Sequence, residues 1–165
     1  MFLKIVNILL TKHTDMGSGL LYFISDYGYT HASIGLEGDP HFYSFNYRGF
    51  CIETAQKHKN RGVKRSCCYQ IEVSEQAYVW LQQMIQRFQD CRSYFKYTRL
   101  GVLCCAVRLP FQRNNYYFCS QFVPEALHLS GALRLKKPAY LYLPDQFCSE
   151  LEKCDDVVRT IYNLV

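Results

Sequence analysis

Long hydrophobic runs are missing from this chain of 165 residues. No stretch approaches the roughly 18 unbroken apolar residues that a membrane-spanning helix requires, so we expect a soluble protein without a transmembrane segment. The first eleven residues resemble a secretory leader, but Asn7 interrupts their apolar run and no small-residue cleavage site precedes His13 and Asp15, which favours a buried first strand. Internal repeats and low-complexity segments are also absent. A chain of this length suits one well-buried core, so we expect a single domain over residues 1–165.

The cysteines also lack the spacing of metal ligands, and they lack the even number that a disulfide framework needs. The chain has nine cysteines, and an odd number without a leader favours reduced thiols in a cytoplasmic protein. Cys67 and Cys68 are adjacent, as are Cys104 and Cys105, whereas paired zinc ligands usually have about two to four residues between them. We therefore expect no metal and no organic cofactor, and we interpret most of the thiols as small buried groups.

Positive charge is in modest excess, with a net charge of +5, and residues 57–65 form one local basic cluster. A nucleic-acid groove would need basic residues along one face with aromatic residues between them, but this cluster stands alone. We interpret it as a solvated loop and expect no nucleic-acid partner.

Hydrophobic periodicity predicts a mixture of strands and helices. Apolar or alternating runs predict strands over residues 2–10, 31–36, 42–47, 63–73 and 156–165. Turn residues at 38–40 join the second and third of these runs into a hairpin. Apolar residues at three- and four-residue spacing predict helices over 74–91, with Ser74 as N-cap, and over 119–129. A short helix is expected over 20–25, residues 100–107 are ambiguous, and 108–115 and 138–145 are connectors.

Cys119 is set apart from the other thiols by its position at the predicted start of a helix. The first amide groups of a helix have no intrahelical partner and lie at the positive end of its dipole, which favours a thiolate over a thiol. The same amides could stabilise an oxyanion. Cys119 is therefore the candidate nucleophile.

His31 is the candidate base, because it opens a strand whose histidine-bearing face continues with the small residue Ser33. His128 lies nine residues after Cys119, on the opposite side of the same predicted helix. The remaining histidines lie in loop-like or turn surroundings. A third polar group usually orients such an imidazole, and Ser44 and Asn46 share one face of the partner strand, so either could serve.

Three segments together resemble the circularly permuted branch of the NlpC/p60 papain-like superfamily, which includes the YiiX-like proteins. They are His31-Ala-Ser-Ile-Gly-Leu, Tyr43-Ser44-Phe45, and Tyr117-Phe118-Cys119-Ser120-Gln121-Phe122-Val123. In the permuted group the order along the chain is histidine, third polar residue and cysteine, as it is here. The resemblance spans residues 3–147, and its most specific motif is the segment around Cys119.

The resemblance implies an α+β permuted papain-like fold in which the cysteine helix packs on an antiparallel sheet that bears the histidine. It assigns Cys119 as nucleophile, His31 as base and Ser44 as the third residue, where relatives often carry a glutamate. The implied activity is that of a bacterial cysteine hydrolase, an amidase, peptidase or acyltransferase acting on amide or ester bonds. Its substrate would be a small molecule, a peptide or an acyl lipid.

Two alternatives remain open. The first is a non-catalytic ligand-binding module on the same fold, because Ser44 offers no orienting carboxylate. The second is a nucleic-acid-binding domain, which rests only on residues 57–65.

Overall fold

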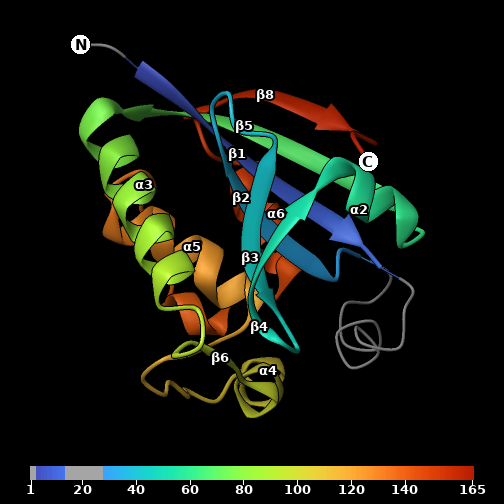
Figure 1. Ribbon diagram of the computed structural model, residues 1–165, viewed down its shortest axis with the longest axis vertical. Coiled ribbons are helices and arrows are strands. Elements are labelled where there is room, and N and C mark those ends of the chain that lie inside the picture. Colours follow the sequence, from blue (N-terminus) through green and yellow to red (C-terminus); the bar gives the residue numbers. More distant parts are fainter. Residues whose placement is uncertain (1–2, 14–27) are drawn as a thin grey trace.

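The computed structural model describes residues 3–13 and 28–165 as an α+β structure with one main antiparallel sheet (Figure 1). The predicted short helix over 20–25 lies outside the described residues. The strands of the main sheet are β1 (Leu3–Lys12), β2 (His31–Leu36), β3 (His41–Asn46), β4 (Gly49–Thr54), β5 (Arg65–Ser74) and β8 (Val157–Tyr162). A small parallel pair consists of β6 (Lys96–Tyr97) and β7 (Tyr116–Tyr117).

The main sheet has the strand order β4-β3-β2-β1-β5-β8, so the first strand of the chain lies in its interior. β1 pairs with β2 on one side and along its full length with β5 on the other. Every neighbouring pair in the main sheet is antiparallel. The long pairing with β5 explains the apolar character of β1, because an interior strand loses both of its edges and most of its surface to neighbours.

The helices are α2 (Ala55–Asn60), α3 (Glu75–Asp90), α4 (Arg99–Ala106), α5 (Cys119–Leu129) and α6 (Pro144–Leu151), with a 3-10 turn η2 (Ala139–Leu141). In Figure 1, α3, α5 and α6 lie together on one side of the sheet, while α2 follows β4 on the other side. No helix within residues 3–13 and 28–165 combines the length and the apolar character needed to cross a membrane.

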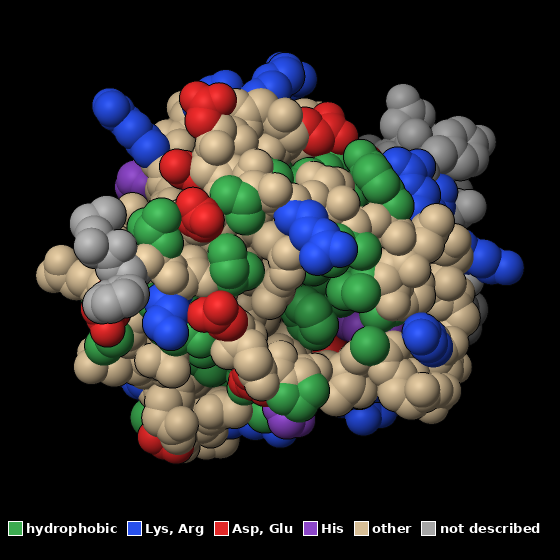
Figure 2. Space-filling view, turned by 90° about the horizontal axis from the view of Figure 1, so that it is seen from above, with side chains coloured by type: hydrophobic (Ala, Val, Ile, Leu, Met, Phe, Trp, Pro, Cys, Tyr) green, Lys and Arg blue, Asp and Glu red, His purple; other side chains and the backbone are tan. Residues whose placement is uncertain are grey.

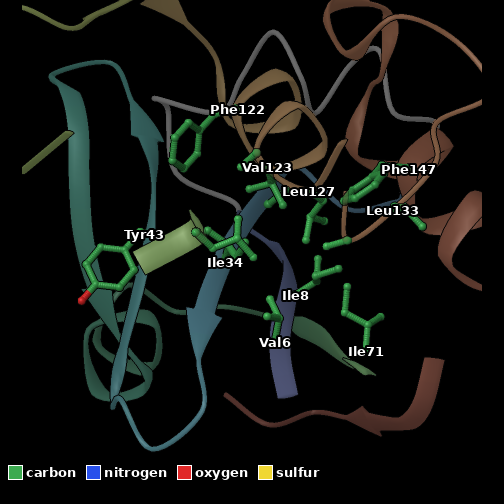
Figure 3. Packing of buried hydrophobic residues seen from close by; sticks show 14 of the residues in the cluster. Val6, Ile8, Ile34, Tyr43, Ile71, Phe122, Val123, Leu127, Leu133 and Phe147 are labelled. Carbon is green, nitrogen blue, oxygen red and sulfur yellow. The ribbon is translucent and has the colours of Figure 1, made fainter. Parts of the chain in front are cut away.

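The main core lies between one face of the sheet and α3, α5 and α6. Alternate strand residues such as Val6, Ile8, Ile34 and Ile71 meet helix residues there (Figure 3). From α5 come Phe122, Val123, Ala126 and Leu127, all buried. Fully burying one such side chain stabilises the fold by roughly 1.5–3 kcal/mol. The other residues of each strand, including His31, face the opposite side of the sheet.

Most of the predicted elements are confirmed. The hairpin of β2 and β3 and the helix over 75–90 with Ser74 as N-cap appear as expected, and the Ser74 hydroxyl accepts a hydrogen bond from the Ala77 amide at 3.2 Å. The prediction for residues 57–65 was wrong in part, because α2 covers the first four of them. Several short elements were not predicted, and β4 was not either. α6 was also missed, and only its first two residues lie in the supposed connector over 138–145.

Candidate active site

Cys119 is the first residue of α5, as the sequence predicted. The N-cap, Phe118, has an extended backbone (φ −127°, ψ 163°) and no side chain that could accept a hydrogen bond from the helix. The first amides of α5 therefore depend on other partners. Pro124 lies inside the helix, which still continues to Leu129. Cys119 itself is only 1% exposed.

Two neighbouring elements fix the start of α5. β7 pairs with β6 just before it, and the Thr98 amide donates to the Tyr117 carbonyl at 3.0 Å. The Thr98 side chain then caps α4 by accepting from the Gly101 amide at 2.9 Å. Val102 and Cys105 on the buried side of α4 form one apolar cluster with Phe118, Cys119 and Leu143. The cysteine therefore lies where α4 and α5 meet.

His31 opens β2 opposite Thr11 of β1, and its side chain is 12% exposed. Its Nε2–H donates to the Glu53 carboxylate, with 2.8 Å between Nε2 and Oε2. The Cys119 side chain also interacts with the imidazole and contributes to raising its pKa. The structure thus brings together the predicted nucleophile and the predicted base, which lie 88 residues apart in the sequence.

The charge on Glu53 decides the protonation state of His31. Burial lowers the pKa of His31, but the attraction of the Glu53 carboxylate and the hydrogen bonds with Cys119 and Glu53 outweigh this and raise it to about 10. An imidazole with this pKa holds its proton at neutral pH. A protonated ring next to a thiol favours the ionised form of that thiol.

Glu53 on β4 takes the place that the sequence assigned to Ser44. Its side chain is 1% exposed, and its second oxygen, Oε1, accepts from Arg61 Nη1 at 3.2 Å. Burial raises the pKa of Glu53, but His31, His58 and Arg61 together lower it to about 2. The carboxylate is therefore ionised although it is buried.

Ser44 faces the same side of the sheet as His31, but the expected contact with the imidazole is wrong. Its hydroxyl donates instead to the Ala32 carbonyl at 2.5 Å, a backbone group on the adjacent strand. Asn46 is also engaged elsewhere, because its Oδ1 accepts from the Arg48 amide at 2.9 Å. The carboxylate that contacts His31 comes from β4, one strand further from β2 than expected.

The sequence did contain a signal for Glu53. In β4, Phe50 and Ile52 belong to the core side, whereas Cys51 and Glu53 alternate with them on the other face. An acidic residue in such an alternating run, shortly after a hairpin that carries the base, marks a position on the same face as that base.

Two other histidines also approach His31, although the sequence placed both in loops. His13 and His58 are 5% and 1% exposed, and their ring centroids lie 5.6 and 6.2 Å from that of His31. His58 Nε2 is 3.5 Å from Glu53 Oε2. Burial and the positive charges of His31, His13 and Arg61 outweigh Glu53 and lower the pKa of His58 to about 4. His58 is therefore neutral at pH 7, and the cationic partners of Glu53 are His31 and Arg61.

The histidines outside this cluster have other surroundings. His41 pairs with Asp39, with 2.7 Å between Nδ1 and Oδ1. His128 is exposed near the end of α5, on the side of the helix away from the core. No group of three or more histidine, cysteine or acidic residues within the described ranges has the arrangement of a metal site.

A cavity of about 340 Å³ lies between α3 and α5, and neither His31, Glu53 nor Cys119 lines it. Its walls are largely aromatic, with Arg87 and Glu125 as the charged residues. Burial raises the pKa of Glu125. This cavity is therefore separate from the cysteine and histidine cluster.

The chain was compared with protein-family models and with curated proteins, and neither comparison found a match.

Proposed function

We propose that this chain is a cysteine hydrolase or acyltransferase with a permuted papain-like fold, in which Cys119, His31 and Glu53 act together. The observation that carries the proposal is the His31 imidazole, which has the Glu53 carboxylate on Nε2 at 2.8 Å and also interacts with the Cys119 side chain. Cysteine hydrolases need this order of nucleophile, base and orienting group.

The reaction would begin from a Cys119 thiolate beside the His31 imidazolium, because His31 already holds its proton at neutral pH. The thiolate attacks the carbonyl carbon of an amide or ester, and the backbone amides at the start of α5 receive the developing oxyanion. His31 then gives its proton to the leaving amine or alcohol, and the acyl group remains on sulfur as a thioester. Water, or another acceptor in an acyl transfer, loses a proton to His31 and releases the acyl group.

Glu53 has two tasks in this proposal. Its Oε2 fixes the orientation and tautomer of His31, and its charge stabilises the imidazolium that forms during the reaction. Because the side chain is held in place by Arg61 as well as by His31, the carboxylate is in position before the substrate binds.

The rival hypothesis of a non-catalytic binding module rested on the lack of an orienting carboxylate at Ser44. Glu53 supplies such a group, which removes that argument. The substrates that fit the proposal are small molecules, peptides or acyl lipids with an amide or ester bond. Because Cys119 is 1% exposed, access to the sulfur requires a local movement of the residues around it.

The decisive experiment is alkylation by iodoacetamide between about pH 5 and pH 9, with the rate at each cysteine followed by peptide mass spectrometry. We expect Cys119 to react fastest in the acidic half of this range, where ordinary thiols are protonated, and to lose this advantage in His31→Ala. Equal behaviour of Cys119 and the other cysteines, or an unchanged profile in His31→Ala, would refute the proposal.

A further inference from the structure

We propose that the α4 end of the molecule docks on the surface of an anionic lipid bilayer. The proposal concerns a surface formed by Leu100, Leu103, Val107 and Leu109, which we call the α4 surface. It does not depend on the chemistry proposed for Cys119, because binding to lipid can be measured without any reaction.

The α4 surface is apolar and open to solvent. Leu100, Leu103, Val107 and Leu109 are 55%, 46%, 65% and 57% exposed. The first three follow the spacing i, i+3, i+7, which places them within about 60° of arc on a helix. α4 itself lies at the lower end of the view in Figure 1, beyond the helices that cover the sheet.

The other side of α4 already has its partners. Val102 and Cys105 are buried in the cluster that contains Phe118 and Cys119. A Cβ added at Gly101 would lie 3.3 Å from the Phe118 ring, which shows how closely this side packs. The exposed leucines are therefore not core residues of a loosely packed helix. They belong to a second apolar face with no partner among the described residues.

The end of α4 turns the chain so that the apolar surface continues. The Arg108 amide donates to the Cys105 carbonyl at 3.0 Å and the Leu109 amide to the Cys104 carbonyl at 2.8 Å, the two hydrogen bonds of a Schellman motif. Arg108 occupies the left-handed position of this motif, with φ 59°, where glycine is usual. The turn leaves both Arg108 and Leu109 exposed just beyond Val107.

The positive charge of this end of the molecule indicates an anionic partner. Residues 91–124 contain no aspartate or glutamate but five cationic residues, Arg92, Lys96, Arg99, Arg108 and Arg113. The net charge of the whole chain is +5, so this segment accounts for all of it. By contrast, the face at the opposite end of the molecule, which Figure 2 shows, carries acidic and basic side chains side by side.

An anionic bilayer matches both properties of this end of the molecule. Amphipathic helices at membrane interfaces bury their apolar face among the acyl chains and place cationic residues near the lipid headgroups. A second copy of the chain would fit less well, because its own five cationic residues would approach these. A nucleic acid would find aliphatic side chains here, which offer no surface for base stacking.

The test is flotation of the protein with phosphatidylcholine vesicles that contain about 30% phosphatidylserine, compared with vesicles of phosphatidylcholine alone. We expect binding to the anionic vesicles, weakened when the salt concentration rises from about 0.1 to about 0.5 M. Leu103→Glu should lower the affinity about tenfold, and Val158→Glu, on the similarly exposed Val158 of β8, should leave it unchanged.

The cationic contribution has its own matched pair of variants. Arg99→Gln and Arg108→Gln should each weaken binding about fivefold, while Arg159→Gln on β8 should have a smaller effect. Circular dichroism confirms that each variant is folded. Failure of the wild-type protein to float, equal losses in Leu103→Glu and Val158→Glu, or self-association that Leu103→Glu abolishes in the absence of lipid binding would overturn the proposal.

Discussion

Glu53 carries a negative charge although its side chain is 1% exposed, and three basic side chains surround it. An isolated buried carboxylate would be neutral, because transfer from water to the protein interior disfavours the charged form. Here the pKa of Glu53 falls to about 2, while its nearest partner His31 rises to about 10. The two groups therefore hold each other in the charged form.

Replacing Glu53 by glutamine removes this charge and nearly preserves the shape of the side chain. Without the carboxylate, burial dominates at His31 and its pKa falls, so the imidazole is neutral at pH 7. We expect the alkylation rate of Cys119 near pH 7 to fall about 100-fold, because a neutral imidazole no longer stabilises the thiolate beside it. The measurement is the iodoacetamide profile followed by mass spectrometry.

Ser44→Ala is the matched control for Glu53→Gln. Because the Ser44 hydroxyl donates to the Ala32 carbonyl, we expect its loss to leave the pH dependence of Cys119 alkylation unchanged. A profile that shifted in Ser44→Ala and stayed unchanged in Glu53→Gln would restore Ser44 as the orienting residue.

At the scale of elements, α2 serves the site through its last turn. The helix begins at the Thr54 cap, directly after Glu53, and ends at Arg61, whose guanidinium reaches back to Glu53 Oε1 at 3.2 Å. Glu53 lies just before α2 and Arg61 just after it, so this short helix brings the two residues of the ion pair together. Arg61 is a positioning residue in this arrangement, because it touches Glu53 rather than Cys119 or His31.

The Arg61→Met variant tests whether Arg61 acts by holding Glu53 in place or only through its positive charge. If Arg61 holds Glu53 in place, the variant frees the carboxylate to leave His31 and the pKa of His31 falls. If Arg61 acts only through its positive charge, its removal raises the pKa of His31. We expect the fall, measured by NMR titration of the labelled imidazole.

Two further variants support the test of Arg61. Arg61→Lys should restore part of the pKa of His31, because it keeps the charge near Glu53. Lys59→Met removes a neighbouring exposed charge from α2 and should leave the titration unchanged. The same shift in Lys59→Met would show that Arg61 has no special position.

The contact between α4 and α5 depends on Gly101. A Cβ at this position would lie 2.6 Å from Cγ2 of Thr98 and 3.3 Å from the Phe118 ring. Thr98 cannot move away easily, because its hydroxyl caps α4. Gly101→Ala should therefore lower the free energy of unfolding by about 1–3 kcal/mol, measured by urea denaturation. The half-buried position Ala106 gives a control: Ala106→Gly should cost no more than about 1 kcal/mol.

Elements with a clear period were predictable from sequence, whereas β4 and α6 were not. The hairpin of β2 and β3 and the helix α3 have strong alternation or helical spacing. β4 follows β3 after only two residues, and its first half reads as a continuation of the aromatic run. α6 begins at Pro144, shortly after Pro138, and prolines are typical of connectors. Tertiary packing decides such segments more than local preference does.

At the scale of the whole molecule, the pKa shifts predict how stability depends on pH. His31 has a folded pKa of about 10 against an ordinary 6.5, so its stabilising effect is complete below pH 6.5 and disappears as the pH rises toward 10. His58 has a folded pKa of about 4, so stability falls as the pH decreases from 6.5 to 4. Glu53 adds a further loss from pH 4.5 toward 2. The free energy of unfolding should therefore be largest near pH 6.5.

Urea denaturation at a series of pH values checks this expectation. His31→Gln should flatten the alkaline side of the profile and His58→Asn the acidic side between about pH 4 and 6.5. An unchanged alkaline slope in His31→Gln would mean that other groups dominate the pH dependence.

The candidate site was predictable from sequence in its two chemical partners but not in its third. Cys119 and His31 could be found because each begins an element, and the start of a helix or strand is visible in local sequence. Glu53 depends on the pairing of β3 with β4 and on the approach of α2, which involve residues that have no local relation to His31. The burial of His13 and His58 likewise comes from packing rather than from their polar sequence neighbours.

The strand order has a kinetic consequence for the site. His31 lies on β2, between β1 and β3, whereas Glu53 lies on β4, the outermost strand of the sheet. Edge strands open locally at a lower free energy than interior strands, so their amide protons exchange with solvent without global unfolding. Brief fraying of β4 would withdraw the carboxylate while the thiol and the imidazole keep their places. Hydrogen exchange in β4 would therefore report how often the site is interrupted in an otherwise folded molecule.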